Sequence, residues 1–350
     1  RGPAGAGSAP PTPGTSSPWS PAPPEEGPWA ELLDCSTPVP DFHRLLPEPA
    51  FKWPFEPDPF QQQAALCLER GHSLLVAAPT SAGKTAVAQY GVALARRHLA
   101  RAIYTSPVKA LSNQKFRELR GTFQDVGLLT GDVRLHPEAA CLVVTTEILR
   151  SMLYNGSDVI ADLEWVIFDE VHYINDAERG VVWEEALILL PPHVKLILLS
   201  ATVPNALEFA QWVGRTKRRC VRVLSTSRRP VPLEHFLFVG GGAVGQPHGH
   251  GGGGTPTPTQ PHGAGTGLYL IRDAQGTFST RGYYAAAEAL KQQQSPKSRP
   301  PPGGPGSGPP PNRGAERALW PALLLGLGAR GGLPLIAFTF SRQRCDEQAD

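Results

Sequence analysis

Residues 78–85, Ala-Pro-Thr-Ser-Ala-Gly-Lys-Thr, have the residue types of a phosphate-binding loop. They follow the apolar run 73–78 and precede residues 86–99, whose apolar positions recur with a helical period. A strand, a tight loop and a helix in this order present backbone N–H groups to anionic oxygens. The Lys84 ammonium would lie near the β- and γ-phosphates, and the Thr85 hydroxyl could ligate Mg²⁺. Ala78 stands where the usual pattern has a glycine, but the flanking strand and helix still predict a nucleotide site. Its residues are Ala78, Pro79, Thr80, Ser81, Ala82, Gly83, Lys84 and Thr85.

Two adjacent acids, Asp169 and Glu170, end the apolar run that starts at Trp165. An aspartate at the end of a buried strand could hold Mg²⁺, directly or through water. The neighbouring glutamate could orient and deprotonate the water that attacks a γ-phosphate. A surface turn that happens to carry Asp-Glu is the alternative, and it is disfavoured by the apolar strand before the acids and the Lys-Thr loop upstream.

A third polar segment, Ser200-Ala-Thr202, ends the apolar run that starts at Lys195. Its two hydroxyls could hydrogen-bond the Asp-Glu segment and sense its state. His172 follows the two acids and could be a simple core histidine. We favour for it a link between the γ-phosphate and the Ser200–Thr202 turn.

The rest of the globular region alternates short apolar runs with helical patterns. Strands are predicted at 74–78, 101–105, 126–130, 141–146, 165–170, 195–202 and 220–224. Helices are predicted at 86–99, 107–120, 146–154, 180–190 and 205–214. This alternation indicates an α/β fold, a parallel sheet with helices on both faces. The carboxyl ends of such strands build the ligand site.

Composition changes along the chain predict four segments. Residues 1–50 form a flexible Pro/Gly-rich segment, and 51–239 a globular nucleotide-binding domain. Residues 240–316 form a partly low-complexity linker or insertion, with an ordered piece at 268–290 that reads as two short strands around 274–276 and then a helix. Residues 317–350 begin a second domain, with a helix at 318–327 and a strand at 333–340.

Bulk composition limits the choice of compartment. The formal net charge of +2 indicates no particular partner, and the five cysteines match no zinc spacing. No segment approaches the roughly 20 apolar residues of a membrane span, and the N-terminus lacks the apolar core of a signal peptide. These features predict no membrane association and a place in the cytoplasm, with the nucleus as the alternative.

The three polar segments together resemble motifs I, II and III of DExH-type superfamily 2 helicases. Further segments resemble those of the Ski-like RNA helicases within that superfamily. Residues 104–115 resemble motif Ia, 130–132 motif Ib, 145–153 the following RNA-facing motif, 59–61 the adenine-reading glutamine motif, and 338–346 motif IV.

This resemblance implies a RecA-like P-loop NTPase fold, the truncated start of a second RecA-like domain, and ATP with Mg²⁺ as cofactors. It implies an ATP-dependent 3′–5′ RNA helicase, with Phe55 and Gln61 at the adenine. The implied catalytic residues are Lys84, Asp169, Glu170, His172, Ser200 and Thr202, and the implied metal ligands are Thr85 and Asp169.

Small and polar residues at the predicted strand ends and helix starts are suited to single-stranded RNA. Such groups grip phosphates and 2′-hydroxyls without reading bases. Helix caps and turns are the alternative role for any one of them, and both roles use the same free N–H groups. The expected RNA-binding residues are Thr105, Ser106, Pro107, Lys109, Asn113, Thr130, Gly131, Asp132, Thr145, Thr146 and Glu147.

Within the family, residues 169–176, 200–208 and 276–284 resemble the superkiller type most closely. That type implies superkiller-complex tetratricopeptide and WD40 subunits and the RNA exosome as partners. A nuclear exosome-type RNA helicase, a DNA helicase and a non-enzymatic scaffold are the alternatives. No arginine finger is found before Asp350, so we expect these 350 residues alone to bind ATP weakly and hydrolyse it poorly.

Overall fold

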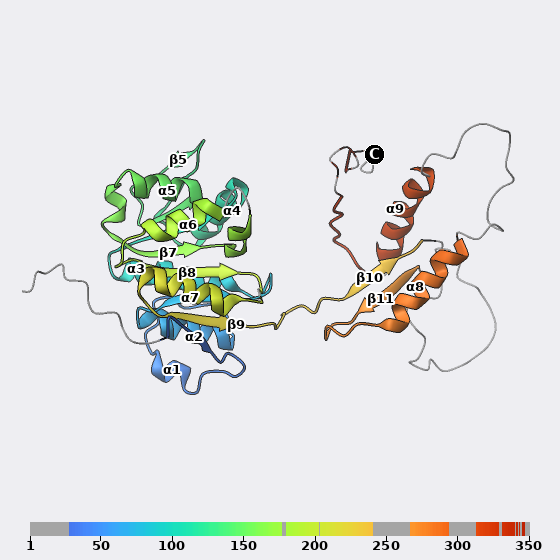
Figure 1. Ribbon diagram of the computed structural model, residues 1–350, viewed down its shortest axis with the longest axis horizontal. Helices are drawn as coiled ribbons and strands as arrows, with labels where there is room; N and C mark the ends of the chain where they lie inside the picture. The colour runs from blue at the N-terminus through green and yellow to red at the C-terminus, as the bar shows by residue number, and fades with distance from the viewer. Residues whose placement is uncertain are drawn as a thin grey trace, which may run out of the picture. The chain divides into compact units, whose positions relative to one another are not determined.

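The computed structural model describes residues 28–176, 180–202, 204–240, 267–293, 313–328 and 331–339, and positions 341, 343, 345 and 346. The chain forms two compact units, residues 1–230 and 231–350 (Figure 1). The division after Pro230 precedes the boundary predicted at 239. No helix in the described ranges combines the length and the apolar character that crossing a membrane requires.

The first unit is built on one nine-stranded sheet, ordered β1-β9-β2-β8-β7-β3-β6-β4-β5. Neighbouring strands are parallel except at β4–β5. Its strands are β1 Ala30–Leu33, β2 Ser73–Ala77, β3 Arg101–Ser106, β4 Val126–Leu129, β5 Arg134–Leu135, β6 Cys141–Thr145, β7 Leu163–Phe168, β8 Lys195–Ser200 and β9 Val221–Ser225. Each strand predicted between 74 and 224 is present, and the predicted fold class is confirmed.

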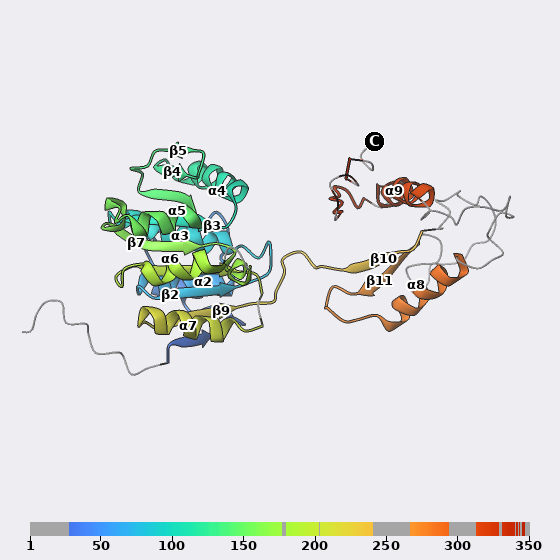
Figure 2. The same ribbon diagram turned by 45° about the horizontal axis from the view of Figure 1, so that its top comes forward.

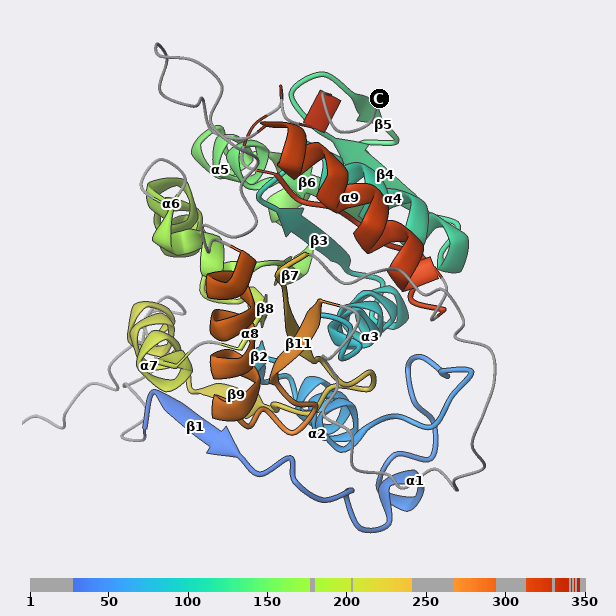
Figure 3. The same cartoon turned by 90° about the vertical axis from the view of Figure 1, so that its right-hand side faces the viewer.

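Helices cover both faces of this sheet, as Figure 3 shows. Helices α2 (Pro59–Glu69), α3 (Lys84–Arg97) and α4 (Lys109–Thr122) pack on one face. Helices α5 (Thr146–Tyr154), α6 (Gly180–Leu189) and α7 (Ala206–Lys217) pack on the other. Successive residues of β2 enter opposite cores, Leu74 and Val76 one and Leu75 and Ala77 the other. A strand buried on both faces needs such a continuous apolar run. The short helices are α1 (Phe42–Leu45), η1 (Asp158–Ile160) and η2 (Val171–Asn175).

The first described residues depart from the predicted flexible segment at 1–50. Residues 30–33 form β1, which pairs in parallel with β9 at the edge of the sheet. A Cβ on Gly214 of α7 would meet the Trp29 carbonyl oxygen at 2.0 Å, so a glycine is needed where the chain enters β1. The prediction was wrong here because a four-residue strand is stabilised by a partner far along the chain, not by its own composition.

The second unit contains β10 (His235–Phe238) and β11 (Leu268–Arg272), an antiparallel pair, with α8 (Thr280–Gln293) packed on β11 (Figure 2). A Cβ on Gly282 would meet the Leu270 carbonyl oxygen at 1.9 Å, so this glycine lets α8 approach β11 closely. The helix predicted at 318–327 is present as α9 (Arg313–Gly328).

Two predictions for this unit were wrong. The expected hairpin around 274–276 amounts to a single bridge between Arg272 and Phe278, because β11 pairs with β10 instead. Residues 333–339 form no strand, because no strand among the described residues pairs with them. The low-complexity tracts and part of the motif IV segment lie outside the described residues.

Candidate functional site

The polar segments identified in the sequence meet at the carboxyl ends of the parallel strands. In the strand register, Ala77 of β2 lies opposite Ser200 of β8, and Thr105 of β3 lies opposite Phe168 of β7. Ser106 lies opposite Thr145 of β6. The carboxyl ends of neighbouring parallel strands therefore bring the loop, the two acids and the expected RNA-binding segments together.

The phosphate-binding loop is compact. Ser81 and Gly83 have positive φ angles of 68° and 95°, and α3 begins at Lys84. The Lys84 ammonium donates to the Ala78 carbonyl at 2.8 Å and to the Pro79 carbonyl at 3.2 Å. Burial lowers the pKa of Lys84, and the carboxylates of Glu170 and Asp169 oppose that shift. The Lys84 ammonium thus contacts the loop and is close enough to both acids to interact with them electrostatically.

Asp169 is held in a fixed position just after β7. It is 7% exposed, and its main-chain N–H donates to the Thr105 carbonyl at 2.9 Å. Its Oδ1 accepts the Glu170 N–H at 3.0 Å, and its Oδ2 accepts the Tyr104 hydroxyl. Burial and the nearby Asp169 carboxylate raise the pKa of Tyr104 well above its ordinary value, so this hydroxyl remains a donor.

Glu170 and His172 come shortly after Asp169, and both side chains are partly exposed. Glu170 has φ 54°, a left-handed conformation that costs a non-glycine residue energy and is found preferentially at functional sites. His172 is the second residue of η2, and its Nδ1 lies 3.4 Å from Glu170 Oε2. The predicted role of His172 as a link to the Ser200–Thr202 turn stays a prediction.

Thr85 and Asp169 offer hydroxyl and carboxylate oxygens, the hard ligands that Mg²⁺ prefers. Within the described ranges, no group of three or more His, Cys, Asp and Glu side chains could hold a metal. A metal here would therefore depend on these two residues and on phosphate oxygens. The Lys115 ammonium donates to Thr85 Oγ1 at 3.1 Å and to Glu118 Oε2 at 2.8 Å.

Gln61 ties α2 to the phosphate-binding loop. It is 2% exposed; its Oε1 accepts the Asp58 N–H at 2.9 Å, and its Nε2 donates to the Gly83 carbonyl at 3.1 Å. A cavity of about 190 Å³ adjoins this contact, lined by Cys35, Ser36, Asp58, Pro59, Phe60, Ala82, Thr226, Ser227, Arg228 and Pro230. Phe55 is 51% exposed and is not among these lining residues. Adenine contact by Gln61 and Phe55 stays a prediction.

A second cavity, of about 420 Å³, opens at the carboxyl ends of β3 and β6; we call it the groove. It is lined by Pro107, Val108, Lys109, Gly131, Thr145, Glu147 and Ile148. Five of these belong to the predicted RNA-binding set. At the groove, Lys109 forms an exposed ion pair with Asp132, with 2.6 Å between Nζ and Oδ2. Asn113 is also exposed.

Other residues of that set are buried and hold the strand ends together. The Thr105 hydroxyl donates to Thr146 Oγ1 at 3.2 Å, and Ser106 shares a 2.8 Å hydrogen bond with Ser112. Thr130 is 8% exposed, and its N–H donates to the Val133 carbonyl at 2.8 Å. These residues therefore stabilise turns and strand ends, and their contact with RNA stays a prediction.

The Ser200–Thr202 turn contacts the phosphate-binding loop through its main chain. The Ala78 N–H donates to the Ser200 carbonyl at 3.1 Å. Ser200 is buried and Thr202 is exposed. Their predicted hydroxyl contacts with the Asp-Glu segment stay a prediction.

Two residues of the site, Tyr104 and Lys115, had no role assigned from the sequence. Both lie in the segment that resembles motif Ia, and each reaches one of the predicted metal ligands. The signal for Tyr104 was a hydroxyl on a residue within a predicted buried strand, since buried hydroxyls need partners. For Lys115 no local signal distinguishes it from the other cations of α4.

Comparison with known proteins agrees with this geometry. Residues 58–209 match the DEAD/DEAH box helicase family. The chain is 58% identical over 337 residues to "Superkiller complex protein 2" of Homo sapiens, covering 95% of this chain and 25% of that protein. It is 59% identical over 223 residues to "Antiviral helicase SKI2" of Saccharomyces cerevisiae, covering 63% and 17%. It is 42% identical over 300 residues to "Exosome RNA helicase MTR4" of Mus musculus, covering 86% and 26%.

The chain thus spans about a quarter of the length of the first of these relatives. The parallel-dominant sheet with helices on both faces is the RecA-like helicase fold. By these matches and by the motifs that meet at the carboxyl ends of its strands, residues 58–209 of the chain are a DEAD/DEAH box helicase domain, similar to that of the Ski-like RNA helicases.

Proposed function

We propose that the protein is an ATP-dependent RNA helicase that moves 3′–5′ along single-stranded RNA, with ATP and Mg²⁺ as its cofactors. One observation carries this proposal: Lys84, Thr85, Asp169 and Glu170 follow the carboxyl ends of β2 and β7, and the groove opens at the ends of β3 and β6, next to β7 in the sheet. Phosphoryl transfer requires mainly positioning and charge neutralisation, and this set supplies both.

The side chains of the site have separate roles in this proposal. Lys84 binds the phosphates, and Thr85 and Asp169 hold the metal, which would neutralise charge on the phosphate oxygens. Glu170 orients the attacking water and accepts its proton. His172, Ser200 and Thr202 transmit the state of this site to the RNA-facing strand ends.

The proposed substrate and partners are supported by the similarity to these relatives. Identity is higher to the superkiller-type relatives than to the exosome helicase, 58% against 42%. We infer a superkiller-type protein of the cytoplasm that feeds RNA to the exosome with tetratricopeptide and WD40 subunits. A nuclear exosome-type helicase is the runner-up.

The test is Glu170→Gln in the complete protein. We expect nucleotide binding to persist and RNA-stimulated phosphate release to fall by about 10²–10⁴-fold, the usual contribution of a general base. Glu164→Gln is the matched control, since Glu164 lies at the start of the same strand and pairs with Lys195 at 2.8 Å. Full turnover by Glu170→Gln would exclude Glu170 as the general base, and wild-type protein without RNA-stimulated turnover would support the scaffold alternative.

RNA and DNA of equal length and sequence should be compared in the same assay. Stimulation by RNA alone supports the proposal. Equal or stronger stimulation by DNA would overturn the choice of RNA, because contacts to the backbone distinguish the two only through the 2′-hydroxyl.

A further inference from the structure

We propose that Tyr104 is a positioning residue of the metal site, whose hydroxyl fixes the Asp169 carboxylate in the orientation that receives Mg²⁺. This inference rests on the proposed function, because it assigns Asp169 the metal. Nothing in the motifs assigns Tyr104 a role, since it lies within β3 as one of its buried strand residues.

The geometry is specific. Tyr104 is fully buried at 0% exposure, and its hydroxyl donates to Asp169 Oδ2. The other carboxylate oxygen, Oδ1, accepts the Glu170 N–H at 3.0 Å. With one donor on each oxygen, the carboxylate has a single preferred rotation, although the last torsion of a free aspartate is broad.

Partners of this kind matter to metal sites. Carboxylates that bind a metal are themselves held by hydrogen bonds from neighbouring groups, and loss of such a partner typically lowers metal affinity or activity by about 10–100-fold. Removal of the Tyr104 hydroxyl leaves the carboxylate free to rotate. The metal must then order it on binding, so the affinity falls.

Strand β3 also connects the metal site with the groove, because Pro107 and Val108, which follow this strand, line the groove. Thr105, the residue after Tyr104, accepts the Asp169 N–H at 2.9 Å and donates its hydroxyl to Thr146 at 3.2 Å. Tyr104 and Thr105 therefore hold Asp169 by side chain and main chain from a strand whose end adjoins the groove. A displacement of the end of β3 would therefore also displace the Asp169 carboxylate.

The experiment is a Mg²⁺ titration of the binding of a fluorescent ATPγS analogue to the complete protein and to Tyr104→Phe. We expect the Mg²⁺ concentration at half-saturation to rise by about 10-fold in the variant. Affinity for the analogue in EDTA should change less than about twofold, because the hydroxyl touches the metal ligand and not the phosphate-binding loop.

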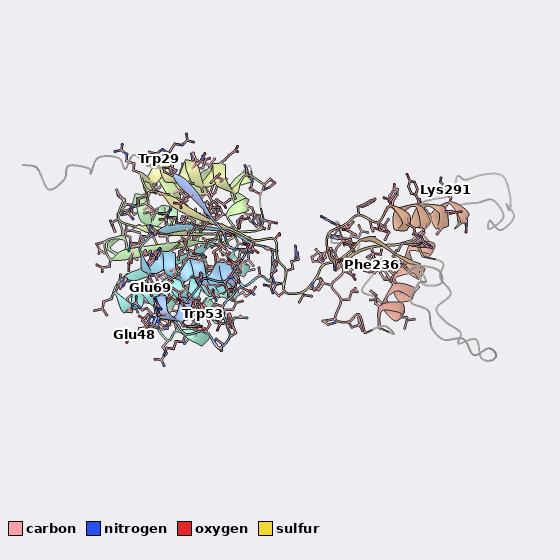
Figure 4. All side chains as sticks on the ribbon, turned by 90° about the horizontal axis from the view of Figure 1, so that it is seen from below. Trp29, Glu48, Trp53, Glu69, Phe236 and Lys291 are labelled. Carbon is pink, nitrogen blue, oxygen red and sulfur yellow. The ribbon has the colours of Figure 1, made fainter. Side chains whose placement is uncertain are left out.

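Tyr90→Phe is the matched control. Tyr90 is also 0% exposed, and its hydroxyl donates to a carboxylate, Glu69 Oε1, at 2.6 Å. Its ring stacks on Trp53, with 5.2 Å between the centroids; Figure 4 labels Trp53 and Glu69 in the first unit. This variant loses a comparable buried hydrogen bond, so it should leave the Mg²⁺ midpoint unchanged.

The possible outcomes test the inference about Tyr104 and the proposed function separately. A Mg²⁺ midpoint in Tyr104→Phe equal to that of wild type, or an equal shift in both variants, overturns the inference and leaves the proposed function standing. Wild-type binding that does not respond to Mg²⁺ overturns the metal site and the inference together. A second test is the same titration of Asp169→Asn and of its double variant with Tyr104→Phe, because equal midpoints of these two support action through Asp169 and additive shifts refute it. Melting curves identify a temperature at which all variants are folded, and the titrations are carried out there.

Discussion

The carboxyl ends of the strands carry two regions that are built in different ways. The nucleotide side comprises the phosphate-binding loop and the residues around Asp169, and the groove side comprises the residues that line the groove. On the nucleotide side, polar groups bond to one another in partly or fully buried positions: Gln61 to Gly83, Lys84 to Ala78, and Tyr104 to Asp169. At the groove, Lys109 and Asp132 meet as an ion pair whose side chains are 55% and 73% exposed.

This difference matches what each side has to bind. One nucleotide in one geometry is served by groups whose positions are set in advance, since preorganised groups need no reordering on binding. A polymer that slides past needs contacts with its backbone that are easily made and broken. Substitutions on the nucleotide side should therefore cost more affinity, each for its own ligand, than substitutions at the groove.

The largest difference is expected at the two buried glutamines of α2. Gln61→Met removes the hydrogen bond to Gly83 and should weaken nucleotide binding by about 10-fold, the equivalent of roughly 1.4 kcal/mol. Gln62→Met removes bonds to Val39 (2.9 Å) and Pro57 (3.1 Å) instead, so it should lower the melting temperature similarly but leave nucleotide affinity near wild type. Calorimetric titration with the nucleotide checks both. Equal losses of affinity would mean that the contact with Gly83 is only structural.

A smaller effect is expected at Lys115. Lys115→Met removes a mostly buried cation, 14% exposed, from the Thr85 hydroxyl. Nucleotide affinity should fall about fivefold, or roughly 1 kcal/mol, the upper end for partly exposed charge pairs. Arg117→Met is the control, because it removes a positive charge from the exposed face of the same helix. An unchanged nucleotide affinity in Lys115→Met would exclude the cation from the nucleotide side.

The smallest effect is expected at the groove. Lys109→Ala should weaken RNA binding about threefold and lower the slope of log affinity against log salt by about 1, since one phosphate contact is lost. Lys52→Ala removes an exposed lysine outside the groove and should change neither quantity. Fluorescence anisotropy with labelled RNA at several salt concentrations measures both. If Lys109→Ala loses more RNA affinity than Gln61→Met loses nucleotide affinity, the expected difference between the two sides is wrong.

Sequence patterns predicted the centre of the sheet because its strands are continuous apolar runs, which a helix-covered parallel sheet requires. They did not predict β1 or the pairing of β11. Both depend on partners that lie far along the chain, β9 for the first and β10 for the second. Local composition carries no information about such register.

The same limit applies to the site. The phosphate-binding loop and the Asp-Glu pair are contiguous, so their chemistry was visible in the sequence. The hydroxyl of Tyr104 reaches across 65 positions to Asp169, and the Lys115 ammonium across 30 to Thr85. Spacing does not encode such contacts, so they became visible only in three dimensions.

The pairing of β1 with β9 has a practical consequence for anyone who prepares this protein. A fragment that starts at residue 51, where the composition turns globular, would leave the β9 edge with a row of unpaired N–H and C=O groups. Such a row is a template for strands of other copies and leads to aggregation. Soluble preparations should therefore begin ahead of Trp29, whose carbonyl accepts the Val221 N–H at 3.0 Å and starts the pairing.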